Sequence, residues 1–570
     1  MLRPDSLDLG DKAEAALQHF ISMVDRKLYC LPFFSTQLYA DPPEANHCYW
    51  DSAEMPGSWV DAVILLRLMT GSEDGLEVER QLKGELLSHW GEDGLRYHKP
   101  YAWDPPLRMV EDPILMNAHS LAYVLNGLVT WFKETGDAEV KGRVNGVVKG
   151  LLRSVIRYTG PGIPKRCYWF PADNYTPSGW QVTRHFWNMP HTHPFNGAMI
   201  LALTLFYEET GDEEALELAE GLSNYVLNLS RAFGYDGGFI GHTHGVLWTV
   251  SGILKYGLIT QRREVVEWAK QVYDFAVRQS SSFGWIPELM FERPPPGLPE
   301  GCETCTVENL LWIAILLAKA GYEEYWGDVE RITRNQLVES QLTEAAVQRG
   351  IRNGWVKVST VKEDTAQTSY QDVAHRAVGG FASRAQPNDY TPLKIEGCCD
   401  AMGSRALYIV WDNIVRKTAE GVYVNLLLSR DSPWVEVVSY HPYEGKVEVN
   451  VHEAPTLFIR VPEWAQVIQV HVDDQPRTVE WAGLRSRYIR VQGLQPNQRV
   501  TVTHTMMRKR ETQVVAGREY LIDWKGDTIT RMWPEGGNYP LYQREHMNAD
   551  KAPMIEKKEV LFGKGRVHLA

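Results

Sequence analysis

The chain repeats one local pattern through much of the sequence before residue 420: an apolar helix ends in glycine, and a more polar helix follows after a short turn. The clearest copies end at Thr70-Gly71, Thr135-Gly136 and Thr210-Gly211. A glycine behind the last helical residue favours a left-handed C-cap, and an acidic residue after it favours the start of the next helix. The pattern therefore predicts repeated helical hairpins.

Repeated helical hairpins build either an open solenoid or a closed ring. The loops before the apolar helices are long and uneven, which favours a closed α/α ring with apolar inner helices. These loops are rich in Trp, Tyr, His and Pro, as in Asn46–Asp51, Tyr97–Trp103, His185–His193 and Gly241–His244. We expect them to form a polar, aromatic cup at one rim of the ring.

The sequence changes character after residue 420, where short β-branched segments alternate with turns. Lys446–Val451 alternates apolar and polar residues strictly, and Val467–Val472 nearly does so, as half-buried strands do. We therefore predict an α+β multidomain protein. A helical ring over residues 1–420 precedes a β-sandwich over 421–515. Residues 516–570 form a β-hairpin and a tail that packs on the sandwich or the ring.

Composition excludes several classes of partner. The chain has 570 residues and a net charge of -13, which argues against nucleic acid or an anionic membrane. It has no apolar run of about 18 residues, so we expect no membrane span. The first residues lack the apolar core of a secretion signal, and the seven cysteines are an odd number. We therefore expect a cytoplasmic protein with reduced thiols and no disulfide framework.

Two cysteine motifs stand directly before predicted helices and could meet in space. The first is Glu303-Thr-Cys305, and the second is the adjacent pair Cys398-Cys399. One carboxylate and three thiolates are ligands that zinc accepts in a tetrahedral site. Four protein ligands are typical of a structural zinc, and buried cysteines without a metal are the simpler alternative. The residues alone leave these alternatives open.

The motifs, taken together and in this order, resemble glycoside hydrolase family 127. The resemblance rests on four features: Glu303-Thr-Cys305 before a long helix, Asp328-Val-Glu330 followed by Asn335, Cys398-Cys399 at a helix start, and Leu457–Ala465 in the predicted sandwich. It is clearest from about Gly284 to Ala465. The resemblance implies an (α/α)6 barrel followed by β-sandwich domains, and the activity of a β-L-arabinofuranosidase.

The resemblance also implies the roles of the cysteines. Cys398 would be the nucleophile that forms a thioglycosyl intermediate. Zn²⁺ would be held by Glu303, Cys305 and Cys399, with Cys398 as the fourth ligand. A thiolate is the reactive form of cysteine, and a metal lowers the pKa of the thiol.

A retaining glycosidase also needs a carboxyl group that protonates the leaving oxygen and later activates water. The resemblance places this group in the loop before Glu303. Glu288 is our candidate, and Glu292 and Glu300 are its rivals. Histidines of the ring loops would bind the sugar, and the candidates are His119, His193, His242 and His244.

We therefore expect a zinc-dependent retaining exo-glycoside hydrolase that releases a terminal L-arabinofuranose-like sugar from a carbohydrate substrate. Two alternatives stay open: a carbohydrate-binding scaffold with a structural zinc and no turnover, and a lyase or epimerase on the same barrel. Fold alone does not decide among them. A homodimer is possible, although no residue requires one.

Overall fold

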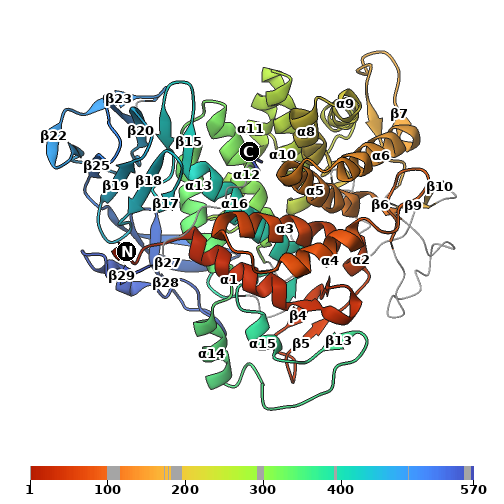
Figure 1. Cartoon of the computed structure of the whole chain (residues 1–570), viewed down its shortest axis with the longest axis horizontal. Coiled ribbons are helices and arrows are strands. Elements are labelled where there is room, and N and C mark those ends of the chain that lie inside the picture. The colour runs from red at the N-terminus through yellow and green to blue at the C-terminus, as the bar shows by residue number, and fades with distance from the viewer. Residues whose placement is uncertain are drawn as a thin grey trace.

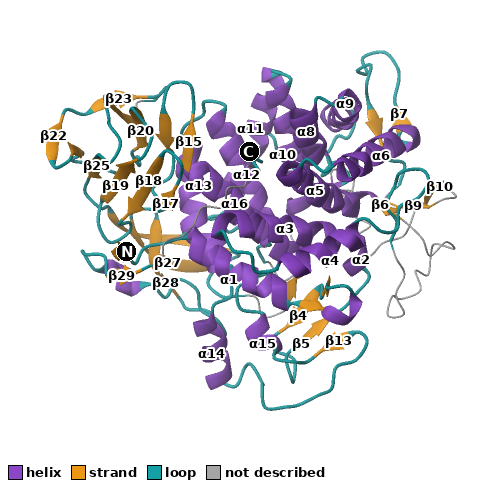
Figure 2. Cartoon of the chain, in the orientation of Figure 1, coloured by secondary structure: helices purple, strands orange, loops and turns teal. Residues whose placement is uncertain are grey.

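A computed structural model describes residues 2–98, 116–172, 174–176, 179–181, 195–291, 301–390, 394–485, 487–557 and 567–569. Among these residues, helices fill one side of the molecule and strands gather mainly on the other, as Figures 1 and 2 show. No helix in the described ranges is both long enough and apolar enough to cross a membrane.

Six apolar helices of the described chain form a closed inner ring. Each contacts the next, and the last returns to the first. In ring order they are α3 (Met55–Thr70), α5 (Ala118–Thr135), α8 (Ile200–Thr210), α10 (Thr243–Ile259), α12 (Thr304–Lys319) and α16 (Gly397–Ile414). Nearly every residue of α10 and α12 is buried. A helix that is apolar on all sides needs such full coverage.

Six amphipathic helices pack around this ring, each against one or two inner helices. They are α1 (Leu9–Ser22), α4 (Leu76–Leu86), α6 (Ala138–Ser154), α9 (Glu213–Asn228), α11 (Arg263–Gln279) and α13 (Tyr325–Ile332). Inner and outer helices alternate along the chain. The predicted α/α ring is thus confirmed as an (α/α)6 barrel.

The predicted glycine turns join inner helices to outer ones. Gly71, Gly136 and Gly211 have φ angles of 66°, 71° and 70°, which is the left-handed conformation of a C-cap. Asp137 and Asp212 follow two of them, and their carboxylates accept hydrogen bonds from the first backbone N–H groups of α6 and α9. The turns of the helical hairpins are therefore determined by neighbouring residues in the sequence, namely the C-cap glycines and the N-cap aspartates.

The predicted β-sandwich follows the last inner helix and is confirmed. One sheet has the order β15-β16-β20-β24-β23 and the other β17-β18-β19-β25-β21-β22 in the described chain. The first sheet comprises Val415–Lys417, Val422–Val424, Thr456–Arg460, Tyr488–Gln492 and Glu480–Ala482. The second comprises Arg430–Asp431, Val435–Ser439, Lys446–Val451, Arg499–Thr503, Gln469–Val472 and Gln475–Arg477.

A further antiparallel sheet follows the sandwich. It contains β26 (Arg508–Val515), β27 (Arg518–Lys525) and β28 (Thr528–Trp533), so it spans the expected boundary between residues 515 and 516. The middle of β26 contacts the barrel, where the hydroxyl of Ser282 donates to the Glu511 carboxylate over 3.0 Å. Near the chain ends, β1 (Leu2–Pro4) pairs with β29 (Met554–Glu556).

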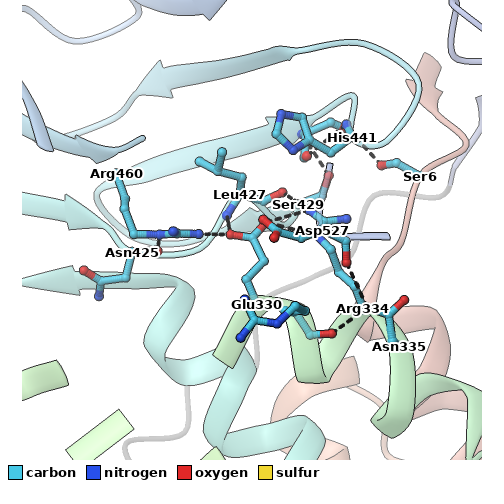
Figure 3. Close-up of polar contacts among 12 residues, drawn as sticks. Ser6, Glu330, Arg334, Asn335, Asn425, Leu427, Ser429, His441, Arg460 and Asp527 are labelled. Carbon is cyan, nitrogen blue, oxygen red and sulfur yellow. Dashed lines mark hydrogen bonds and ion pairs between the residues drawn. The ribbon is translucent and has the colours of Figure 1, made fainter. Parts of the chain in front are cut away.

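A buried ionic cluster joins the barrel to the sandwich (Figure 3). Glu330 of α13 is fully buried, and its carboxylate accepts a hydrogen bond from Nε of Arg334 at 2.9 Å. Arg460 of β20 forms an ion pair with the same carboxylate from the sandwich side. The backbone N–H of Leu427 also donates to it, over 3.3 Å. One carboxylate thus links two domains in the interior of the protein.

A small sheet at the barrel rim lies beside the start of α16. Its order is β13-β5-β4-β14, and its strands are Thr368–Ser369, Glu44–Asn46, Ser35–Gln37 and Ile395–Glu396. In Figure 1, β4, β5 and β13 lie below the barrel helices. Because β14 runs directly into α16, the sheet is fixed relative to Cys398.

Candidate active site

The rim at which the inner helices begin contains a cavity of about 630 Å³. Five of its lining residues are N-cap residues of inner helices, namely Glu54, Asn117, His242, Glu303 and Glu396. Among these, only the Asn117 side chain accepts a capping hydrogen bond. The helix N-termini stabilise negative charge at this rim. The cup expected from the sequence therefore corresponds to this cavity, which is lined by N-cap side chains and faces the N-terminal ends of the helix dipoles.

The two cysteine motifs come together at this rim. Cys305 lies in the first turn of α12, and Cys398 and Cys399 lie in the first turn of α16. The three sulfur atoms all lie within 4.8 Å of one another, and the Sγ atoms of Cys305 and Cys399 are 3.4 Å apart. Of these three residues, which we call the cysteine cluster, only Cys398 lines the cavity. The cluster thus has one accessible member and two buried ones.

Burial raises the pKa of Cys305, because a thiolate in an apolar interior loses its hydration. Burial opposes ionisation of Cys399 as well, but hydrogen bonds from the thiols of Cys305 and Cys398 lower its pKa below the usual value. The pKa of Cys398 is raised instead, so a single negative charge in the cluster is favoured on Cys399.

The cysteine cluster suits zinc. With a Zn–S distance of about 2.3 Å, tetrahedral geometry places two sulfur ligands about 3.8 Å apart, close to the spacing seen here. The carboxylate of Glu303 is two positions before Cys305 and lines the same cavity. It belongs, however, to a neighbouring group of possible ligands with His242 and Glu288, whose ligand atoms also lie within 4.8 Å of one another.

Glu303 and His242 form a buried pair. Their Nε2 and Oε2 atoms are 2.9 Å apart. Burial raises the pKa of Glu303, and the carboxylate of Glu303 raises the pKa of His242 against the opposite effect of burial. Because both pKa values rise, the pair keeps a proton to higher pH than the two groups would in water. This hydrogen bond also fixes the orientation of the Glu303 carboxylate.

Glu288 lines the cavity and is mostly buried. Arg384 binds both of its oxygens, with Nε–Oε2 and Nη2–Oε1 distances of 2.7 and 3.0 Å. The same guanidinium reaches Glu396 through Nη1 at 3.0 Å. Burial and the charge of Glu303 raise the pKa of Glu288, and they outweigh the opposite effect of Arg384. A carboxyl group in this setting can hold a proton at higher pH than usual.

Two other predicted histidines also line the cavity. His244 is held between the hydroxyl of Tyr123, at 3.2 Å from Nε2, and the Asn309 amide oxygen, at 2.7 Å from Nδ1. Burial lowers the pKa of His244 to about 3, so the ring stays neutral. The side chain of His119 is 19% exposed, and its Nε2 lies 3.6 Å from the carboxylate of Glu54.

Three predicted candidates lie outside the described residues. These are His193, Glu292 and Glu300. The structure therefore compares Glu288 with neither of its rivals.

Sequence reasoning missed several lining residues. Glu54 and Glu396 directly precede apolar helices, so the rule that selected Glu303 could have found them. Arg384 and Gln37 carry no such local signal. They reach the cavity through strand pairing between distant segments.

The sequence matches no protein-family model and no curated protein. Solved structures do match. A GH127 β-L-arabinofuranosidase from Geobacillus stearothermophilus T6 aligns with a TM-score of 0.56 and 14% identity, covering 92% of this chain and 80% of the other. The GH127 β-arabinofuranosidase BT3674 aligns with a TM-score of 0.59 and 15% identity, covering 91% and 80%. The resemblance expected from the motifs is therefore confirmed for the fold.

Proposed function

We propose that the protein is a zinc-dependent retaining glycoside hydrolase with Cys398 as its nucleophile. One observation carries the proposal: Cys398 is the member of the cysteine cluster that lines the cavity. A purely structural zinc site needs no such access, because its ligands only have to close around the metal. The access of Cys398 therefore supports the enzyme over the scaffold.

In the first step, Sγ of Cys398 attacks the anomeric carbon while the bond from that carbon to the leaving oxygen breaks. Glu288 gives its proton to the leaving oxygen, and the raised pKa of its carboxyl group supports this role. In the second step, water attacks the anomeric carbon, Glu288 takes a proton from the water, and the carbon–sulfur bond breaks. Two displacements at one carbon retain its configuration.

Zinc, when bound by Cys305, Cys398, Cys399 and Glu303, would keep the thiols ionised at neutral pH. The protein's own residues supply the remaining support. His242 orients Glu303 through a 2.9 Å hydrogen bond. The N-terminus of α16 points toward the cavity and stabilises charge on the sulfur.

We propose a terminal L-arabinofuranose-like sugar as the reacting unit, in line with the GH127 resemblance. We propose that His119 and His244 bind its hydroxyls, and the support is that both line the cavity. All seven cysteines, each within the described residues, are free thiols. This fits a reducing compartment, so we propose a cytoplasmic enzyme that acts on oligosaccharides or glycoconjugates.

The test is hydrolysis of 4-nitrophenyl β-L-arabinofuranoside and related aryl glycosides by the wild type and by Cys398→Ser. We expect kcat to fall by about 10³-fold or more, since the loss of a nucleophile is among the largest catalytic defects. Cys30→Ser is the matched control, because this buried thiol lies outside the cavity. Mass spectrometry of wild type quenched during turnover should find a glycosyl group on the Cys398 peptide.

Metal analysis accompanies this test. We expect about one zinc per folded chain and its loss in Cys305→Ser. If Cys398→Ser hydrolyses the substrate at the rate of the wild type, the mechanism is refuted. A zinc-loaded wild type that hydrolyses no glycoside would instead favour the scaffold.

A further inference from the structure

A chain of hydrogen bonds connects the interior of the barrel to the cavity. It ends at Tyr123 of α5, which lines the cavity and places its hydroxyl 3.2 Å from Nε2 of His244 on α10. Nδ1 of His244 is 2.7 Å from the amide oxygen of Asn309 on α12. The amide nitrogen of Asn309 donates in turn to Oε2 of Glu308. Three inner helices thus contribute to one polar connection, which we call the Tyr123 relay.

The chemistry of these groups gives the relay a direction. An asparagine amide has a donor end and an acceptor end, so donation of its nitrogen to Glu308 turns its oxygen toward His244. Because an amide oxygen can only accept, Nδ1 of His244 carries the proton. The neutral ring then has a lone pair on Nε2, and this lone pair accepts the hydrogen of the Tyr123 hydroxyl. The oxygen of Tyr123 is left as an acceptor at the cavity.

Buried neighbours hold this direction. His244, Asn309 and Glu308 are each at most 2% exposed, and Trp248 stacks on the His244 ring with the centroids 5.2 Å apart. Nε of Arg405, which can only donate, lies 3.7 Å from Oε1 of Glu308. Burial raises the pKa of Glu308 to about 8, and a proton bound below that pH can reside on Oε1, which makes no hydrogen bond in the described chain. Oε2 therefore stays the acceptor that orients Asn309.

Tyr123 shares a helix face with a predicted sugar ligand. It follows His119 by four positions on α5, which places both side chains on one side of the helix, and both line the cavity together with Cys398. An acceptor in this wall selects a group that donates. A sugar hydroxyl satisfies it, whereas an ether oxygen or a fluorine has no hydrogen to give and leaves the buried oxygen without a partner.

We propose that the oxygen of Tyr123 accepts a hydrogen bond from one hydroxyl of the reacting sugar, and that Asn309 and Glu308 are positioning residues that set this direction. This inference rests on the proposed function and adds a requirement on its substrate. At one position the sugar must have a hydroxyl that donates, and an acceptor of similar size does not replace it.

The experiment compares kcat/KM for 4-nitrophenyl β-L-arabinofuranoside with kcat/KM for its 2-, 3- and 5-deoxyfluoro analogues. In Tyr123→Phe, we expect the preference for hydroxyl over fluorine to fall about tenfold at one of these positions and to stay at its wild-type value at the other two, since one hydrogen bond is lost. The electronic effect of fluorine on the reaction is common to both enzymes and cancels. Tyr273→Phe is the matched control, because this buried tyrosine bonds Asp328 outside the cavity.

Two variants of Asn309 test the positioning role. Asn309→Leu no longer accepts from Nδ1 of His244, so it should reduce the preference at the same position as Tyr123→Phe. Asn309→Asp still accepts from Nδ1 and should retain the preference. If these two variants show the same preference, Asn309 has no part in the relay.

A preference that Tyr123→Phe leaves unchanged at all three positions would overturn the proposal. An equal loss on the parent glycoside and on every analogue would also overturn it, because a merely structural role predicts that result. Failure of the proposed function looks different, since the wild type would then hydrolyse none of these glycosides. The relay is also tested without turnover, by the ¹⁵N chemical shifts of histidine-labelled wild type, with the His244 signals identified by their absence in His244→Gln. We expect the proton on Nδ1, and a proton on Nε2 would refute the relay.

Discussion

At the scale of single residues, Arg384 determines how Glu288 faces the cavity. Its guanidinium binds both oxygens of Glu288 and one of Glu396. Gly301 packs against this arginine so closely that a Cβ on Gly301 would lie 2.7 Å from the Cβ of Arg384. Arg384 is therefore a positioning residue for the proposed acid.

Replacing Arg384 by Gln should change both the rate and its pH dependence. Loss of the bidentate clamp should lower kcat/KM on aryl glycosides by about tenfold or more, since general acid catalysis contributes 10²- to 10⁴-fold. Arg384 lowers the pKa of Glu288, so its removal lets the acid keep its proton to higher pH. The basic limb of the profile of kcat/KM against pH should therefore move to higher pH.

Arg352→Gln, on the exposed end of α14 (Glu344–Arg352), is the control and should leave the profile unchanged. A basic limb that stays in place in Arg384→Gln would remove Glu288 from the acid role.

At the scale of elements, the site depends on the start of each inner helix. The apolar stretches and their glycine caps are local signals, so the barrel could be predicted from the sequence. Glu303, Cys305, Cys398 and Cys399 were found because each stands directly before or within a first helical turn. The positions of Gln37 and Glu44 in the cavity lining could not be found, because they depend on strand register with β14, far along the chain.

The spacing of inner helices α3 and α5 depends on two facing glycines. A Cβ on Gly57 would lie 2.5 Å from the carbonyl oxygen of Tyr123, and one on Gly127 would lie 2.4 Å from that of Gly57. The backbones therefore touch where Tyr123 enters the cavity.

Gly57→Ala should lower the free energy of unfolding by about 1–3 kcal/mol, because overpacking outweighs the better helix propensity of alanine. Gly142→Ala on α6 is a matched control with nothing within 4 Å of its Cβ, so it should stabilise by up to about 1 kcal/mol. Urea unfolding measures both. Equal effects of the two variants would show that the close contact carries no cost.

At the scale of the whole molecule, Glu330 couples the barrel to the sandwich. Burial opposes its charge, but the guanidinium groups of Arg460 and Arg334 together hold its pKa below the usual value. Figure 3 shows the carboxylate between groups from both domains. None of these three residues lines the cavity. The cluster therefore holds the barrel and the sandwich together and takes no part in the proposed reaction.

Glu330→Gln should destabilise the protein by about 3–5 kcal/mol, because it leaves two buried guanidinium groups without their anion. Because the pKa of Glu330 is lower in the folded than in the unfolded protein, the difference from wild type should be full near neutral pH and shrink as pH falls through the lowered pKa of Glu330. Glu344→Gln, at an exposed position of α14, should change stability little. The measurement is urea unfolding at pH 7 and pH 4 with zinc content held constant. A loss below about 1 kcal/mol at pH 7 would mean that the Glu330 carboxylate does not couple the domains, because even partial stranding of the two cations costs more than that.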